Sequence, residues 1–392
     1  GKIGVQPFIE SSEKFNHILI CSNNSKNGPL EINFNIINRL FDSVFKSFSI
    51  DKNLIYIAGF SGGSRLATAV AVLTKQIQGV IACGAGFSPN NAHIPISKEN
   101  FSYVGLVGDR DMNYQEMLKV KDWLDRLQIS NEIFTYEDEH RWPPSSQIVK
   151  AFSWLELQAY TKNIKPKNEM LINEFYQSTY NTAISLEHKN QLIPAVWEYE
   201  RILRNFSRYY NLDSIKSKIK QLKEGKAYTT EIKKCKEIEI EEAKIRKKFV
   251  EKFSYEIDNI PNNYKWWRKE LKKFNDKNQE FNDPDYDKMG KRINYALFAM
   301  AIENSYSQLR KNNITKALYC HHLVAIMIPE QPFPYYLIAK DYAVLNNEDK
   351  FIEYLKIAVS KGYSNKNQLL NTKEFENYKN SKSFNLLLKE ML

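Results

Sequence analysis

The chain has 392 residues, 43% hydrophobic and 26% charged, which is typical of a globular protein with two or three domains. No apolar stretch approaches the roughly 20 residues that a membrane-spanning helix needs, so the sequence predicts no membrane span. The formal net charge of +10 is uneven: residues 1–160 carry a net −1 and residues 161–392 a net +11. We interpret this excess as the solvated surface of Lys-rich helices rather than as a nucleic-acid site.

The four cysteines are widely separated and form no CxxC pair, so they predict neither a disulfide framework nor a metal site. Cys21 and Cys83 lie in apolar runs and are expected to be small core residues. The sequence opens with Gly1 rather than Met, as it would after removal of a leader or if it were a fragment of a longer chain. Localisation is therefore left unassigned, with a periplasmic or secreted location favoured over the cytoplasm.

The first 160 residues alternate helical and strand patterns. Helical spacing covers residues 7–15, 31–48, 113–127 and 147–160. Short apolar runs predict strands at His17–Cys21, Leu54–Ala58, Gly79–Cys83, Tyr103–Val107 and Glu132–Tyr136. Continuous apolar strands that alternate with helices indicate an α/β fold, with a doubly wound, mostly parallel sheet.

Beyond residue 162 the strand signals stop, and the pattern predicts an all-α region. We expect an α/β domain at 1–162, a helical linker or hairpin region at 163–295, and a helical-repeat domain at 296–392. Residues 229–253, dense in Lys and Glu, are expected to form a long and mostly exposed helix.

The last segment contains a possible internal repeat. Ala317 and Pro329 fit the small and closing positions of a 34-residue tetratricopeptide frame. The same frame places Ala339, Tyr342, Leu355 and Ala358 at the next repeat's small and aromatic positions. The match fades upstream and the Trp-x-x-Leu-Gly signature is missing, so a generic helical bundle stays an alternative.

A strand, a sharp turn and a helix are predicted around Gly59-Phe60-Ser61-Gly62-Gly63. A serine at the tip of so tight a turn needs neighbours without side chains, which explains the glycines. The bare Gly-x-Ser-x-Gly pattern should occur by chance in about one chain in ten of this length. The hypothesis of a nucleophilic serine therefore requires an acid and a histidine, in that order, after later strands.

Both appear downstream. Gly108-Asp109-Arg110-Asp111 follows one strand, and His140 follows the last strand. We favour Asp111 over Asp109 as the orienting acid, because the fourth position allows the loop to turn back over Ser61, while Asp109 caps the turn. The remaining histidines, at positions 17, 93, 188, 321 and 322, lack partner spacing and are expected to be structural or exposed.

The three predicted residues form a Ser-Asp-His triad. A neutral imidazole takes the serine proton near neutral pH, and a carboxylate fixes the imidazole tautomer. The backbone N–H of Gly62, at the start of the helix, is expected to be one donor to the oxyanion of the tetrahedral intermediate.

These motifs and His140-Arg141-Trp142-Pro143 make residues 1–160 similar to the α/β-hydrolase superfamily, closest to its dienelactone-hydrolase and carboxylesterase-like branch. The polar stretch Asn23–Gly28 also resembles a loop of bacterial members that carry helical repeats, which suggests Asn24, Ser25 and Asn27 as substrate-site residues. Asp138 and Glu139 stand where the family has small residues, which leaves the charge state of the histidine loop open.

The resemblance also implies a missing element. In the family, one strand precedes the elbow strand directly in sequence but is not its neighbour in the sheet. Another, interior strand lies between these two in space, and the end of that interior strand supplies the second oxyanion donor. Only His17–Cys21 precedes the elbow strand here. An interior gap would leave backbone groups unpaired, at about 1–3 kcal/mol each. We therefore expect the natural protein to continue before Gly1, with the second donor there.

Two other interpretations are weaker. Tyr264-Lys265-Trp266-Trp267-Arg268 mixes aromatic and basic residues as nucleic-acid binders do, but Trp267 and Leu271 at helical spacing predict a packed face. Asp283, Asp285 and Asp287 begin like a calcium loop, but Lys288 replaces its glycine, so we expect no metal and no cofactor.

The sequence thus predicts a serine hydrolase that cleaves a carboxylic ester, with a small-molecule substrate and C-terminal helices that cover the site or dock a protein or peptide partner. A non-catalytic scaffold with an inactive hydrolase domain, and a serine peptidase, stay as alternatives.

Overall fold

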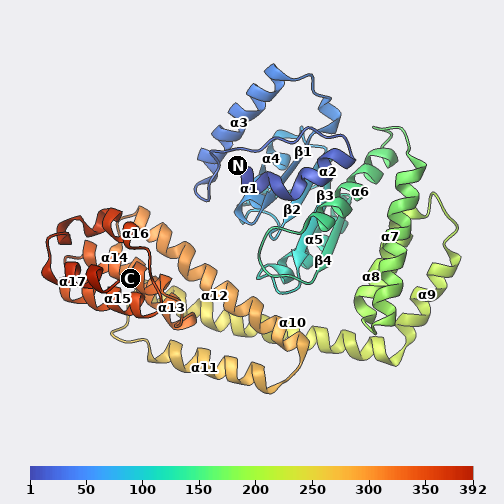
Figure 1. The fold of residues 1–392 in the computed structure, drawn as a ribbon. Coiled ribbons are helices and arrows are strands. Elements are labelled where there is room, and N and C mark those ends of the chain that lie inside the picture. Colours follow the sequence, from blue (N-terminus) through green and yellow to red (C-terminus); the bar gives the residue numbers. More distant parts are fainter. Residues whose placement is uncertain (392) are drawn as a thin grey trace. The chain divides into compact units, whose positions relative to one another are not determined.

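The computed structural model describes residues 1–391 and divides into two compact units, Gly1–Glu239 and Ile240–Leu392 (Figure 1). Helix α10 (Lys226–Glu256) contains the boundary between them. The three segments expected from sequence, with limits at residues 162 and 295, stay predictions. Residue 295 itself lies within helix α12 (Pro284–Arg310).

A four-stranded parallel sheet forms the centre of the first unit. Its strands, in spatial order, are β1 (Tyr56–Phe60), β2 (Gly79–Cys83), β3 (Ser102–Gly108) and β4 (Asn131–Tyr136). Phe60 pairs with Cys83, and Cys83 with Leu106, so the carboxyl ends of β1 to β3 meet at one edge. Four of the five predicted strands are confirmed, with β1 two residues later than expected.

Helices cover both faces of the sheet, because each crossover between parallel neighbours must leave the sheet and return to it. Helices α4 (Gly62–Thr74) and α5 (Tyr114–Arg126) pack on the face that carries Val80 and Ala82. Helix α6 (Ser145–Thr161) packs on the opposite face, over Ile81 and Cys83. The predicted α/β class is therefore confirmed for this unit.

The segment before the sheet is mostly helical. It contains α1 (Lys2–Val5), the 3-10 turn η1 (Gln6–Phe8), α2 (Ile9–Lys14), α3 (Leu30–Ser47) and η2 (Lys52–Leu54). A further 3-10 turn, η3 (Asn91–His93), lies between β2 and β3. The rings of Phe8 and Phe15 pack on Phe152 of α6. The helices predicted near residues 7–15 and 31–48 are confirmed.

The strand predicted at His17–Cys21 is wrong. The segment has no regular structure, and Ile18 and Ile20 are 61% and 38% exposed. A strand requires a neighbour to hydrogen-bond with, and the sheet begins at β1, whose paired neighbour is β2. Side chains hold the segment instead: the ring of His17 packs edge-on against Tyr56. Cys21, expected in the core with this strand, is only half-buried.

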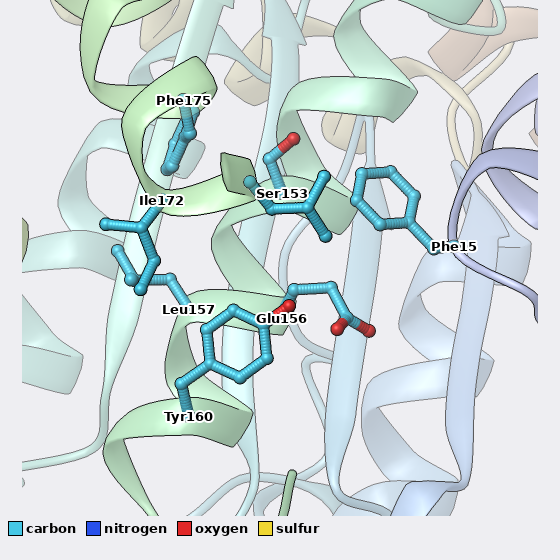
Figure 2. A pocket seen from close by; sticks show the side chains of 8 residues that line it. Phe15, Ser153, Glu156, Leu157, Tyr160, Ile172 and Phe175 are labelled. Carbon is cyan, nitrogen blue, oxygen red and sulfur yellow. The ribbon is translucent and has the colours of Figure 1, made fainter. Parts of the chain in front are cut away.

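A small cavity lies between α6 and α7 (Glu169–His188), as Figure 2 shows. Its volume of about 10 Å³ holds about one water molecule, which is too little for an ester substrate. Glu156 lines it and lies 3.2 Å from His17 Nε2 and 2.6 Å from Lys165 Nζ. Burial opposes ionisation of Glu156, but hydrogen bonds from these two side chains outweigh it and lower the pKa of the carboxyl. Glu156, His17 and Lys165 therefore form a packed polar contact beside the cavity.

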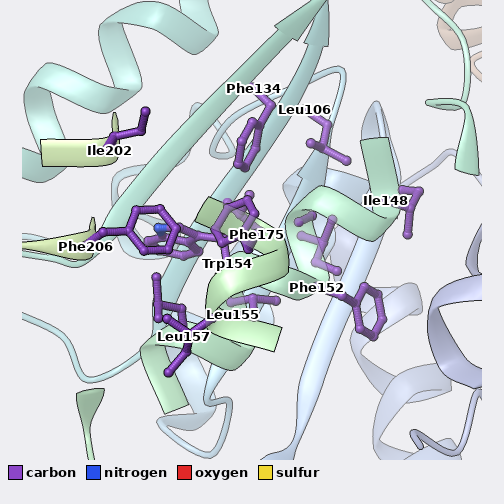
Figure 3. Close-up of a cluster of buried hydrophobic side chains, with 14 of the residues drawn as sticks. Leu106, Phe134, Ile148, Phe152, Trp154, Leu155, Leu157, Phe175, Ile202 and Phe206 are labelled. Atoms are coloured by element: carbon purple, nitrogen blue, oxygen red, sulfur yellow. The ribbon is translucent and has the colours of Figure 1, made fainter. Parts of the chain in front are cut away.

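Residues beyond 162 contribute to the core of the first unit. Figure 3 shows Phe175 of α7 and Ile202 and Phe206 of α8 (Leu192–Phe206) beside Trp154 of α6. Helix α9 (Asp213–Glu224) adds Ile215 to the same cluster. This packing was not foreseen, because the amphipathic pattern of a helix does not identify the surface that it covers.

The outer edge of the last strand, β4, is covered by α8. Arg201 donates from Nη2 to the carbonyl oxygen of Ile133 at 2.8 Å, and its guanidinium lies 4.2 Å from the ring centre of Phe134. Arg201 and Arg204 lie 3.3 and 2.9 Å from the buried carboxylate of Glu132. Burial favours the neutral acid, but the two arginines outweigh it and lower the pKa of Glu132.

The second unit is helical throughout its described residues. Besides α10 and α12 it contains α11 (Lys265–Glu280), α13 (Ile314–Met327), α14 (Phe333–Val344), α15 (Glu348–Ser360), α16 (Lys366–Asn371), η4 (Lys373–Tyr378) and α17 (Lys382–Glu390). Trp267 and Leu271 are buried, and the Trp267 indole donates to Glu256 at 2.7 Å. The packed face predicted for α11 is confirmed, as is the long helix predicted near 229–253.

Helices α13 and α14 share a buried histidine-carboxylate pair. Nδ1 of His321 lies 2.5 Å from Oδ2 of Asp341, and both side chains are buried. Burial raises the pKa of Asp341, against the opposing effect of the hydrogen bond from His321. Nε2 of His321 is buried without a hydrogen-bond partner among the described residues.

Candidate active site

Ser61 lies at the turn between β1 and α4 with φ of 54° and ψ of −118°, a positive-φ conformation that is costly for a residue with a side chain. A Cβ on Gly59 would stand 2.1 Å from the carbonyl oxygen of Gly63, so only glycine fits there. The backbone N–H of Ser61 donates to the carbonyl of Cys83 at 2.8 Å, which extends the pairing of β1 with β2. The surrounding strand and helix therefore impose the strained turn.

Asp111 lies in the loop after β3 and is 1% exposed. The loop closes when Asp111 N–H donates to the carbonyl of Gly108 at 3.1 Å. A Cβ on Gly108 would stand 2.3 Å from the carbonyl oxygen of Asp138. The glycine thus lets the loops after β3 and β4 touch.

His140 connects the other two residues. Its Nδ1 lies 2.8 Å from Oδ2 of Asp111, and its Nε2 lies 2.9 Å from Oγ of Ser61. Its side chain is only 6% exposed, with the ring of Phe60 4.7 Å away between centres. Because Asp111 accepts from Nδ1–H, Nε2 carries the lone pair and can accept the serine proton. The structure thus brings together the three residues predicted from sequence.

The neighbouring carboxylates have other partners. Asp109 Oδ1 accepts from the backbone N–H of Asp138 at 3.2 Å, so Asp109 links the two loops. Asp138 lies 2.6 Å from Arg141 Nε. Burial opposes ionisation of Asp138, but hydrogen bonds from Arg141 and from the Glu139 backbone outweigh it and lower the pKa of Asp138. The negative charge of Asp138, two residues before His140, is therefore paired.

The start of α4 faces the nucleophile. The N–H of Gly62, the first residue of the helix, has no intrahelical acceptor, and the helix dipole adds positive potential there. Such a group can stabilise negative charge on an oxygen bound to Ser61.

The side chain of Ser22 orders the polar loop named from sequence. Oγ of Ser22 accepts from the backbone N–H groups of Asn24 and Ser25, at 3.2 and 3.1 Å. The amide of Asn27 lies against Gly62. Of the three residues suggested, Asn27 is thus the one placed beside the nucleophile turn.

Sequence reasoning missed two residues that support Asp111. The backbone N–H of Asn113 donates to Asp111 Oδ1 at 2.8 Å, and its side-chain amide donates to the carbonyl of Gly84 at 2.7 Å. Gly84 has φ of 63°, and a Cβ there would stand 3.0 Å from Asp111 Oδ2. The Gly84-Ala85-Gly86 stretch directly after β2 was an available signal, because a glycine at a strand end often permits a close approach.

Among residues 1–391 no group of three or more His, Cys, Asp or Glu side chains is arranged to hold a metal ion. The same residues contain no helix that is both long and apolar enough to cross a membrane.

No family model matches the chain, and no curated protein matches it. Among solved structures it is similar to the crystal structure of an S-formylglutathione hydrolase from Staphylococcus aureus in its apoenzyme form, with 21% identity and a TM-score of 0.27. The match covers 31% of this chain and 59% of that hydrolase, so this chain spans less than two thirds of its length. At this score the similarity does not bear on activity, and the chemical argument depends on the side chains described above.

Proposed function

We propose that the first unit is a serine hydrolase of the α/β-hydrolase type that cleaves a carboxylic ester through an acyl-enzyme. The observation that carries this is the continuous hydrogen-bond chain from Ser61 through His140 to Asp111, beginning at a strained serine. Such strain costs about 1–3 kcal/mol and persists mainly at functional sites. The triad order and the strand-turn-helix context agree with it.

In the proposed reaction, Ser61 Oγ attacks the ester carbonyl while its proton moves to His140 Nε2. The carbonyl electrons move to oxygen, and the N–H of Gly62 stabilises this oxyanion. The intermediate collapses, and the alcohol leaves with the proton from His140. A water molecule, deprotonated by His140, then attacks the acyl-serine. The bond between the acyl carbon and Ser61 Oγ breaks, the acid is released, and His140 returns the proton to Ser61 Oγ. Asp111 stabilises the imidazolium at both stages.

A fluorophosphonate probe tests the proposal. The natural chain should be labelled on one serine, and Ser61→Ala should abolish labelling. The matched control is Ser64→Ala: Ser64 is fully buried three residues away and donates to the carbonyl of Ala85, so labelling should persist. A folded natural chain that never labels would support the inactive-scaffold alternative instead.

Ester and peptide substrates distinguish the two hydrolase classes. If the first unit is an esterase, kcat/KM for a 4-nitrophenyl ester should exceed that for the corresponding 4-nitroanilide. Comparable efficiency on both, lost together in Ser61→Ala, would favour the peptidase.

For the second unit we propose tetratricopeptide-like packing of α13 to α15 and a role in docking a protein or peptide. Supporting this, the predicted small residues Ala317, Ala339 and Ala358 are completely buried. A larger side chain at such a site forces the helices apart. Ala339→Leu should therefore lower the thermal stability of the chain, whereas Val344→Leu, at an exposed position of the same helix, should not.

A further inference from the structure

Asn27 explains why residue 62 is glycine. A Cβ built on Gly62 would stand 2.6 Å from Oδ1 of Asn27 and 3.9 Å from its Nδ2. The backbone does not require glycine here, because φ of Gly62 is not positive. At Gly63, by contrast, a Cβ would meet nothing within 4 Å. The absent side chain at position 62 is thus what leaves room for the asparagine amide beside the nucleophile.

The loop that presents Asn27 is held on both sides by one buried amide. Oδ1 of Asn33, in the first turn of α3, accepts from the backbone N–H of Lys26 at 3.3 Å. Nδ2 of Asn33 donates to the carbonyls of Lys26 and Pro29, at 2.9 and 3.3 Å. Asn33 is 5% exposed, whereas Asn27 itself is exposed to solvent. A buried polar group therefore fixes the loop and leaves the Asn27 amide free to bind.

We propose that the side-chain amide of Asn27 is the second donor to the oxyanion that forms when Ser61 attacks. The inference rests on the proposed function. An oxygen that accepts from the N–H of Gly62 must lie at the first residue of α4, which is where the Asn27 amide lies. A half-turn about the Cβ–Cγ bond exchanges Oδ1 and Nδ2, so the NH₂ group can face this position.

This assignment places the missing donor within the chain. The family resemblance placed the second donor before Gly1, at the end of an interior strand. Asn27 would make such a strand unnecessary for oxyanion binding, and Asn33 would be its positioning residue. A donor of this kind acts on the charge that develops in the transition state and not on the neutral ester.

The test compares Asn27→Ala and Asn27→Asp with the natural chain on 4-nitrophenyl acetate. Asn27→Ala should lower kcat about 10²-fold, with KM and the pH profile little changed. Asn27→Asp should lower kcat further, because a carboxylate repels the oxyanion. Affinity for a trifluoromethyl ketone, which forms the same oxyanion on Ser61, should fall in parallel with kcat. The control is Asn35→Ala, an exposed asparagine on α3.

Asn33 is tested through its coupling to Asn27. Asn33→Ala should also lower kcat without changing KM, and adding it to Asn27→Ala should cause little further loss. Additive losses would mean that Asn33 acts on stability and not through Asn27.

Two results would overturn the inference while the proposed function stands: Ser61 is labelled but Asn27→Ala retains the natural kcat, or Asn27→Ala raises KM at unchanged kcat. The first would place the donor elsewhere, and the second would make Asn27 a ground-state contact. A natural chain that does not react at Ser61 would remove the proposed function itself.

Discussion

The two units each contain a buried His-Asp pair. The pairs differ in the hydrogen-bond partner of Nε2, the imidazole nitrogen that does not contact the aspartate. In the first unit, His140 contacts Asp111 through Nδ1 and the Ser61 hydroxyl through Nε2. In the second unit, His321 contacts Asp341 in the same way, but its Nε2 is buried without a partner among the described residues. The same two kinds of side chain therefore form a candidate proton relay in one place and a buried hydrogen-bonded pair in the other.

Position in the fold accounts for the difference. Asp111 and His140 lie on loops at strand ends, where a strained serine and a helix N-terminus can join them. His321 and Asp341 lie within helices α13 and α14, where backbone groups are already paired. A His-Asp contact alone thus does not indicate catalysis. The hydrogen-bond partner of the histidine Nε2 is what distinguishes a candidate catalytic pair from a structural one.

The largest expected contrast is in ester hydrolysis. His140→Ala should lower kcat by about 10⁴ to 10⁶, because Nε2 of His140 is the base hydrogen-bonded to the Ser61 hydroxyl. His321→Ala should leave kcat within about threefold, provided that the chain stays folded by circular dichroism. Equal losses in the two variants would mean that the second pair also serves the reaction.

A smaller contrast separates the two aspartates of one loop. Asp111→Asn should lower kcat about 10⁴-fold, because the amide favours the wrong imidazole tautomer. Asp109→Asn should cost far less, since this carboxylate accepts from the backbone N–H of Asp138, whereas Asp111 is hydrogen-bonded to Nδ1 of His140. Steady-state kinetics of both variants decide between them, and similar losses would show that both carboxylates serve the histidine.

The His321–Asp341 pair should matter more for the stability of the chain than for its activity. Asp341→Ala leaves His321 buried without its partner, and we expect the free energy of unfolding to fall by about 3–5 kcal/mol. Replacing both residues with leucine should restore part of this loss, because no unpaired polar group remains. Urea unfolding followed by circular dichroism measures this loss, and an Asp341→Ala chain as stable as the natural one would show that the buried contact does not stabilise the fold.

The smallest expected effect concerns pH. Burial lowers the pKa of His322 to about 4, helped by the nearby charges of His321 and Arg268. The unfolded chain binds this proton below about pH 6.5, so between pH 6.5 and 4 the unfolded state holds more protons. Stability should therefore fall as the pH is lowered through this range, by at most about 3 kcal/mol. Thermal melts at pH 7 and 4.5 should show less difference in His322→Phe than in the natural chain.

Local patterns predicted the sheet well, because β1 to β3 are each built around a short apolar run, although β4 also contains Glu132 and Thr135. Ser61, Asp111 and His140 were chosen from their order and from the strand ends before them, which the parallel topology places at one edge. The contacts that hold Asp111 in place were harder to predict. Asn113 and Gly84 act through contacts between segments 29 residues apart, which no local pattern records.

Two failures have a common cause. His17–Cys21 has the pattern of a strand but no neighbour to pair with, and α8 has an apolar stripe whose target was unknown. In both cases the sequence shows which residues are apolar, whereas the tertiary structure decides what covers them. The His321–Asp341 pair was missed for the same reason, since its members lie on separate helices 20 residues apart.

The contact between Arg201 and Ile133 has a consequence for synthesis. An uncovered edge strand can recruit strands from other chains, and here Arg201 occupies a carbonyl on that edge. During translation β4 emerges before α8, so this edge stays open for several seconds at ordinary elongation rates. During that interval two nascent chains can associate through their open β4 edges most readily. The interval ends when α8 has been synthesised and packs against β4.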